Sequence, residues 1–223
     1  MGRRRAAFFL LAGAVGLLPT VQPAKAHVYT FTVDHCSASA LCGTGLGTVT
    51  VTQDGANTVK IDVEAVGTGF DFVNSAGKGN EFFFNIGAVL GGNVDNPTIS
   101  VTPLTPGWAL ASTTAGSYGG AGWNFEYALT CLSVSVCAHG ASNPKGPPLI
   151  FDVTATGLTP ASFYNSSGSP VEFAADVRGN LSGNTGLVGA TRTSVPEASG
   201  IASLIVMLAG VGAGVLLKHK RLV

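Results

Sequence analysis

The chain has 223 residues and a formal net charge of zero, but this balance hides an acidic body. Seven of the twelve basic residues lie before residue 27 or after residue 194, whereas eleven of the twelve acidic residues lie between them. Such a body lacks the basic footprint that phosphate backbones require, so we do not expect a nucleic-acid partner. It is also rich in Gly, Thr, Ser and Val and poor in good helix formers, which favours one all-β domain.

The amino-terminal segment has the three parts of a secretory signal peptide. Three arginines precede an apolar run from Ala6 to Leu18, and the segment ends on the small residues Ala24 and Ala26. The apolar run is shorter than the roughly 20 residues that span a bilayer, which disfavours the alternative of an uncleaved anchor. We therefore predict that residues 1–26 are removed by signal peptidase and that the mature chain begins at His27.

Four cysteines occur as two pairs with the same C-x5-C spacing, Cys36 with Cys42 and Cys131 with Cys137. An exported chain meets an oxidising environment, so we expect disulfides. The equal short spacing favours two local loops, although four cysteines allow three connectivities and cross-pairing stays open. A zinc site is the other alternative, but such sites usually space their cysteines more closely. No metal and no cofactor are predicted.

Nine segments of the body alternate apolar and polar residues with the period of a β-strand. Asp54-Gly55 separates the second from the third and predicts a hairpin, while Thr159 is a possible cap for the only helical turn. This pattern predicts an antiparallel β-sandwich of jelly-roll type over residues 27–178. The small polar residues 179–194 are interpreted as a linker. The nine segments are 27–33, 47–53, 58–66, 69–73, 81–86, 98–104, 123–129, 148–155 and 171–177.

Four aromatic residues, Trp108, Tyr118, Trp123 and Tyr164, are candidates for stacking against a sugar ring. Trp123 alternates with other aromatic residues and is therefore expected in the core, whereas Trp108 follows a Pro-Gly turn and is predicted to be exposed. We therefore predict Trp108 as a possible glycan contact. The threonine row Thr48, Thr50 and Thr52 is interpreted as the solvent face of a strand.

The sequence contains no signature of the common hydrolase and phosphate-binding motifs, and no catalytic residue is predicted. A glycosidase would need a pair of carboxylates, and four glutamates of the body could supply them. Three of these, Glu64, Glu126 and Glu172, alternate with apolar residues and are expected to point outward from strands. We therefore expect a protein that is not an enzyme.

The carboxy-terminal segment 195–223 has the form of a membrane sorting tail. The 19 residues from Ser199 to Leu217 carry no charge and predict a transmembrane helix, followed by a basic cluster that favours the cytoplasmic side. With Pro196 and Glu197 before the helix, the tail resembles the PEP-CTERM sorting signal of Gram-negative bacteria. Ala198 stands where that family most often has a second proline.

The resemblance implies partners and a location for this chain. Proteins with such tails are recognised and cut by an exosortase, a membrane protease, so Pro196 and Glu197 would mark the sorting and cleavage site. The chain would be anchored in the inner membrane before cleavage and then reach the cell surface or extracellular matrix. We thus expect a structural or adhesive protein associated with exopolysaccharide; the alternative is a glycan-active hydrolase or a lectin-like carbohydrate-binding protein.

Overall fold

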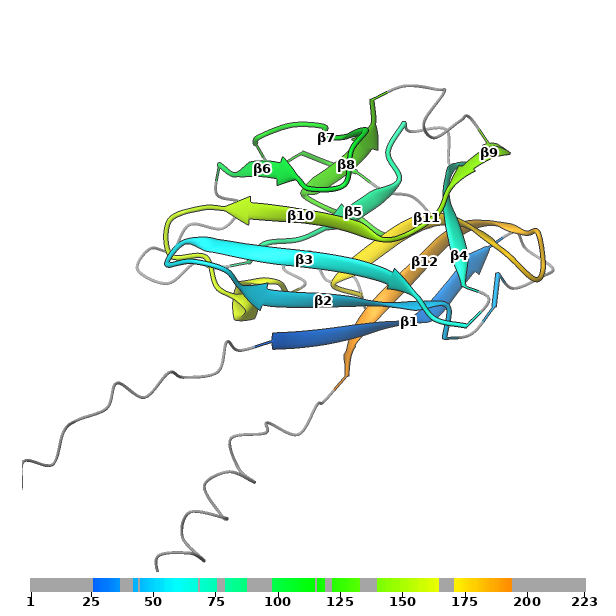
Figure 1. The fold of residues 1–223 in the computed structure, drawn as a ribbon, viewed down its shortest axis with the longest axis horizontal. Helices are drawn as coiled ribbons and strands as arrows, with labels where there is room; N and C mark the ends of the chain where they lie inside the picture. The colour runs from blue at the N-terminus through cyan, green and yellow to red at the C-terminus, as the bar shows by residue number, and fades with distance from the viewer. Residues whose placement is uncertain are drawn as a thin grey trace, which may run out of the picture.

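The structure is a computed structural model that describes residues 26–36, 42–43, 45–67, 69–75, 79–87, 98–114, 116–118, 122–132, 140–164 and 171–193 (Figure 1). This part of the chain is all-β, with one short 3-10 turn, η1 (Pro160–Ser162), which begins after the predicted cap Thr159. The strands are β1 (Ala26–Cys36), β2 (Gly47–Gln53), β3 (Thr58–Ala65), β4 (Phe70–Asn74), β5 (Phe82–Phe84), β6 (Ser100–Pro103), β7 (Trp108–Leu110), β8 (Tyr127–Cys131), β9 (Gly140–Lys145), β10 (Leu149–Thr154), β11 (Phe173–Gly179) and β12 (Thr185–Thr193).

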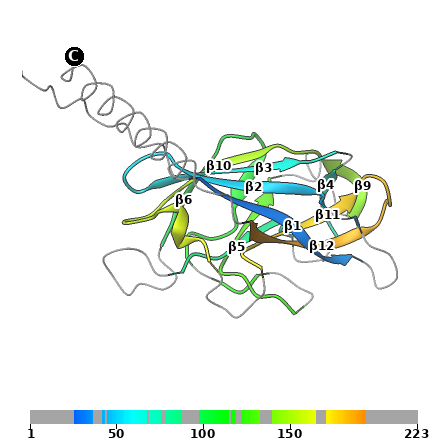
Figure 2. The same cartoon turned by 90° about the horizontal axis from the view of Figure 1, so that it is seen from below.

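The strands form one antiparallel sheet that curls on itself. Its main path runs β6-β10-β3-β2-β1-β12-β11-β5-β8-β7, and the sheet is nearly closed as a barrel. Figure 2 shows the two walls of this curl, with β3 and β10 on one side and β5 and β12 on the other. β4 pairs with β11 beyond the end of β5 and carries β9 on its outer edge. The all-β antiparallel prediction is confirmed, while one continuous sheet stands where two sandwiched sheets were expected.

The predicted hairpin around Asp54-Gly55 is present as β2 and β3. The side-chain amide of Gln53 donates to the carbonyl oxygens of Gly55 and Thr58, which braces the turn. On both strands every second side chain is buried and the others are partly or fully exposed, as the alternation predicts. The inward residues meet those of the other strands in a single large core that is rich in aromatic rings.

Three neighbouring strands, β11, β5 and β8, differ from this pattern because most of their residues are buried on both faces. All three residues of β5 are buried, and so are the first five residues of β11. The second face is covered by a small cluster built around Phe83, Trp123 and Phe125, whose other buried members are Ala128, Val171, Ala174 and Leu187. Phe125 therefore belongs to a different cluster from its alternation partner Tyr127, which lies in the main core.

The stretch predicted as a linker is a central part of the sheet, so that prediction is wrong. β12 lies between β1 and β11 and pairs with both. Its small residues are a packing requirement, because a side chain at Gly189 would overlap Val171 and the ring of Trp123. The described domain thus extends to Thr193 rather than ending at residue 178.

The two ends of the sequence lie outside the described residues. This applies to residues 1–25 of the predicted signal peptide and to the tail 195–223 with its predicted helix. Among the described residues, none forms a helix long and apolar enough to cross a membrane.

Candidate functional site

The most extensive candidate site is the outer surface of β1, β2, β3, β10 and β12, which we call the open face. Its side chains are those that alternate with the core residues and are partly or fully exposed. They are Val28, Thr30, Thr32, Thr48, Thr50, Thr52, Thr58, Lys60, Asp62, Glu64, Ile150, Asp152, Thr154, Thr191 and Thr193. The open face is therefore mostly hydroxyl-bearing, with a charged part on β3 and β10.

The threonines of the open face are aligned across strands. Thr30 of β1 stands opposite Thr48 of β2 on one side and Thr191 of β12 on the other. The hydroxyls of Thr32 and Thr191 lie 2.8 Å apart and share a hydrogen bond. The row predicted on β2 thus has neighbours on two further strands, which the alternation of one strand could not reveal.

The charged part of the open face is net negative, with three carboxylates around one ammonium. Asp152 stands opposite Lys60, and Asp62 and Glu64 continue β3 on the same face. Within the described part of the chain, Lys60 forms no ion pair with any of them. One oxygen of Asp62 and one of Asp152 are shielded from solvent and have no hydrogen-bond partner, which is uncommon for carboxylates.

This environment disfavours the ionised form of both aspartates. Burial raises the pKa of Asp62, Glu64 raises it further, and Lys60 lowers it. Burial also raises the pKa of Asp152, with Asp54 adding to the rise and Lys60 opposing it. A donor or cation placed on the face would stabilise the ionised carboxylates.

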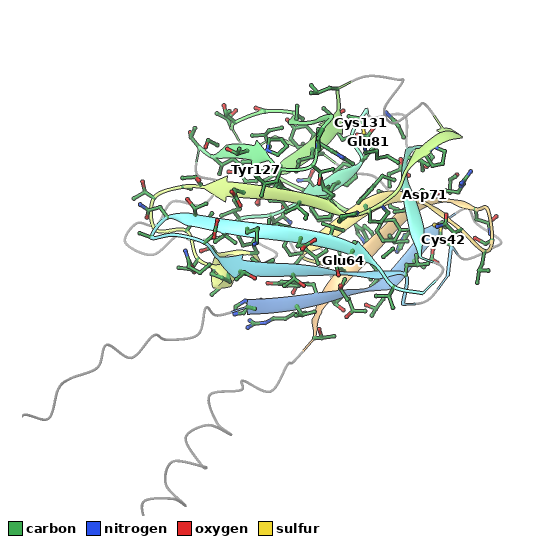
Figure 3. The ribbon with its side chains drawn as sticks, in the orientation of Figure 1. Cys42, Glu64, Asp71, Glu81, Tyr127 and Cys131 are labelled. Carbon is green, nitrogen blue, oxygen red and sulfur yellow. A yellow bond between two sulfur atoms is a disulfide. The ribbon has the colours of Figure 1, made fainter. Side chains whose placement is uncertain are left out.

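A second group of carboxylates lies inside the molecule, next to the doubly buried strands. Glu81, which is 2% exposed, accepts a hydrogen bond from the backbone N–H of Cys131 at 2.9 Å (Figure 3). Burial raises the pKa of Glu81 to about 7, nearby Asp176 adds to the rise, and hydrogen bonds from Cys131, Thr130 and Asn74 oppose it. A pKa near 7 suits a general acid, but this oxygen is held by the backbone in a buried position, so we assign Glu81 to bracing β5 against β8.

The other two buried carboxylates also hold backbone. Asp176 is fully buried and accepts hydrogen bonds from the N–H and the hydroxyl of Ser75. Glu126 accepts from the N–H of Ile86 at 3.0 Å, and its own N–H donates to the side chain of Asn85. The expectation that Glu126 points outward is wrong, because the residue is buried and its carboxylate holds the backbone of Ile86.

The end of the molecule where β1 finishes carries a disulfide between Cys36 and Cys42, as predicted (Figure 3 labels Cys42). The carboxylate of Asp34 accepts hydrogen bonds from Cys36 N at 2.8 Å and Gly43 N at 3.1 Å, which closes the base of the loop. Asp34 and the two sulfurs are close enough to ligate one ion. The disulfide uses both thiols, however, so this group does not fit a metal in its oxidised form.

The remaining predicted site residues have different outcomes. Trp108 is 3% exposed and its ring packs edge-on against Phe72, so its expected exposure is wrong and it cannot stack on a sugar here. The turn before it exposes the backbone, while the alternation within β7 turns the ring inward. Cys131 is disulfide-bonded, and Cys137 lies outside the described residues. Ala26 is the first residue of β1, while Ala24, Pro196 and Glu197 lie outside the described part.

The open face is not evident as a site from the sequence alone, although part of its signal is present there. Alternation in the segments around Lys60, Asp62 and Asp152 places these side chains outward, but only strand pairing brings β3 and β10 together. No family model matches the chain, and no curated protein or solved structure matches it either.

Proposed function

We propose that this chain is an exported surface or matrix protein whose folded body adheres to exopolysaccharide without turning it over. The observation that carries the proposal is that the carboxylates of the body fall into two groups, one buried and one on the open face. Those inside the body hold backbone groups, as Glu81 holds the N–H of Cys131, whereas those on the open face lie among threonine hydroxyls. Aligned hydroxyls and carboxylates suit the many hydroxyl groups of a polysaccharide. Among the described residues, the buried carboxylates Glu81, Glu126 and Asp176 are all engaged by backbone groups rather than paired as glycosidase chemistry requires.

The positions of the chain ends agree with an anchored body. Val28 near the start of β1 pairs with Thr193 at the end of β12, so the described chain starts and finishes at one end of the sheet (Figure 1). A tail following Thr193 would hold the body by this end. The Cys36–Cys42 disulfide lies at the other end of β1 and would be far from the anchor.

We further propose the processing steps that the sequence suggests. Signal peptidase would cut after Ala26, and an exosortase-type protease would recognise Pro196 and Glu197 and release the body from the membrane helix 199–217. Before the second cut the protein would sit in the inner membrane, and afterwards at the cell surface or in the matrix.

The test uses the protein expressed in a host that carries the sorting machinery. The surface form is purified, its mass is measured, and it is incubated with polysaccharide extracted from that host. We expect a species that begins at His27, ends near Pro196 and binds the polysaccharide without producing reducing ends. A surface form that retains the residues after Leu217 would overturn the sorting proposal. Release of reducing ends that is lost in a Glu→Gln variant would instead support the hydrolase alternative.

A further inference from the structure

We infer that the open face is a docking site for a polysaccharide that carries protonated amino groups among its hydroxyls. The inference rests on the proposed function for the class of partner, a glycan. The position of the site and the positive charge expected of the ligand are inferred from the described residues of the open face.

The charge of the face selects the sign of the ligand. Asp62, Glu64 and Asp152 outnumber the single cation Lys60, and Lys60 pairs with none of them among the described residues. Asp62 and Asp152 each keep an oxygen without a hydrogen-bond partner. An ammonium group supplies both the missing positive charge and strong hydrogen-bond donors, so it complements this surface better than a neutral or anionic sugar.

The rest of the face argues for a glycan rather than a protein or a lipid surface. Its apolar side chains are few, chiefly Val28 and Ile150, whereas the core of a protein interface is enriched in aromatic and apolar groups. Anionic membrane surfaces attract basic segments and would be repelled by this one. Threonine hydroxyls on three neighbouring strands can instead both donate to and accept from sugar hydroxyls.

The geometry of the sheet suits an extended chain. Neighbouring strands are about 4.8 Å apart, and residues on one face of a strand repeat every ~6.7 Å, so the polar groups form a regular grid. One row of this grid runs from Thr193 through Val28 and Thr50 to Asp62. A linear polysaccharide laid along this row would meet hydroxyls on β12 and β2 and then the carboxylate of Asp62 on β3. Asp152 of β10 lies in the neighbouring row, opposite Lys60, within reach of a sugar substituent beside the row.

Neutralising Asp62 and Asp152 tests whether their charges are needed for binding, without disturbing the fold. The double variant Asp62→Asn/Asp152→Asn keeps the shape of both side chains and removes charges that the fold disfavours, so it should melt at the same or a higher temperature than wild type. The matched control is Asp71→Asn, which makes the same chemical change on β4, outside the open face, where Asp71 pairs with Arg178 (Figure 3 labels Asp71).

The experiment measures retention of the full chain, kept in detergent, on chitosan, on its fully acetylated counterpart and on neutral polysaccharide extracted from the host matrix. We expect retention on chitosan that weakens with salt, falls at least tenfold in the double variant and is unchanged in Asp71→Asn. Equal retention of the double variant and wild type on chitosan, or an equal loss in Asp71→Asn, would overturn the inference. Binding to the neutral polysaccharide alone would overturn it while leaving the proposed function intact, and binding to none of the three would count against both.

Discussion

Two walls of the same curled sheet use their residues in opposite ways. In β2, β3 and β10 one face packs on the core and the other carries threonines, carboxylates and a lysine. In β5, in the first three residues of β8 and in most of β11 both faces are covered, and the buried carboxylates beside these strands hold backbone groups, as Glu81 does. The first set of strands, the open wall, therefore keeps a polar outer face that is accessible to solvent, whereas the side chains of the second set, the covered wall, are used to hold the fold.

The largest expected loss of stability comes from removing a buried aromatic ring from the covered wall. Phe83 is fully buried, and its ring centroid lies 5.8 Å from that of Phe125 in the second cluster. Phe83→Ala should lower the free energy of unfolding by about 3–5 kcal/mol, since it removes a buried ring and leaves a cavity. The control is Ile150→Ala on the open wall, which should cost clearly less because that side chain is only partly buried. Chemical denaturation checks both, and equal losses would contradict the division between the walls.

The next effect concerns pH and the buried carboxylate Glu81. Its pKa is about 7 in the folded protein and about 4.3 in an unfolded chain, so the folded state binds the proton more tightly. Stability from this group is fully present below about pH 4.3 and is lost as the pH rises through 7. The loss should be at most about 4 kcal/mol, because each pKa unit corresponds to 1.36 kcal/mol.

The variant Glu81→Gln tests this assignment. Glutamine keeps an oxygen that can accept from the N–H of Cys131 but does not titrate. Thermal unfolding between pH 4 and 8 should therefore show a flatter dependence on pH in the variant than in wild type. An unchanged profile would mean that another group, such as the neighbouring Asp176, is responsible.

A smaller effect is expected at the loop that ends β1. Replacing Cys36 and Cys42 together with serine should cost about 2 kcal/mol, because a short closed loop removes little entropy from the unfolded chain. The bonds from Asp34 to the base of the loop should keep β1 folded, so the change is measurable by denaturation without loss of the fold. Complete unfolding of the double variant would show that the loop contributes far more than chain entropy.

The smallest effect is expected on the open wall. Thr50→Val keeps a β-branched side chain of similar shape on β2 and should change the free energy of unfolding by less than about 0.5 kcal/mol. A loss above 1 kcal/mol, measured by denaturation, would mean that the threonine rows stabilise the sheet and are not simply a free surface.

The sequence predicted the strands of the open wall better than those of the covered wall. Alternation correctly predicted β2, β3 and β10, since a half-buried strand has a period of two. It misplaced Glu126, because alternation gives two faces but does not say whether the outer one is covered. Trp108 was misplaced for another reason, since a preceding Pro-Gly turn does not fix the direction in which the ring points. Alternation also missed β12, whose glycines and small residues resemble a linker when the crowding around Gly189 is unknown. The open face needed the pairing of β3 with β10, which is a long-range property.

The position of β12 has a consequence for how the chain reaches its fold. Val28 and Thr193 are 165 residues apart and yet bonded, so the pair that joins the two halves of the sheet is also among the most distant in sequence. During synthesis β1 emerges early, and one of its edges stays unpaired until the last strand arrives. Contacts of such long range form slowly, and an open edge invites pairing with other chains. A nascent or truncated chain that lacks residues 185–193 should therefore be the most aggregation-prone form of this molecule.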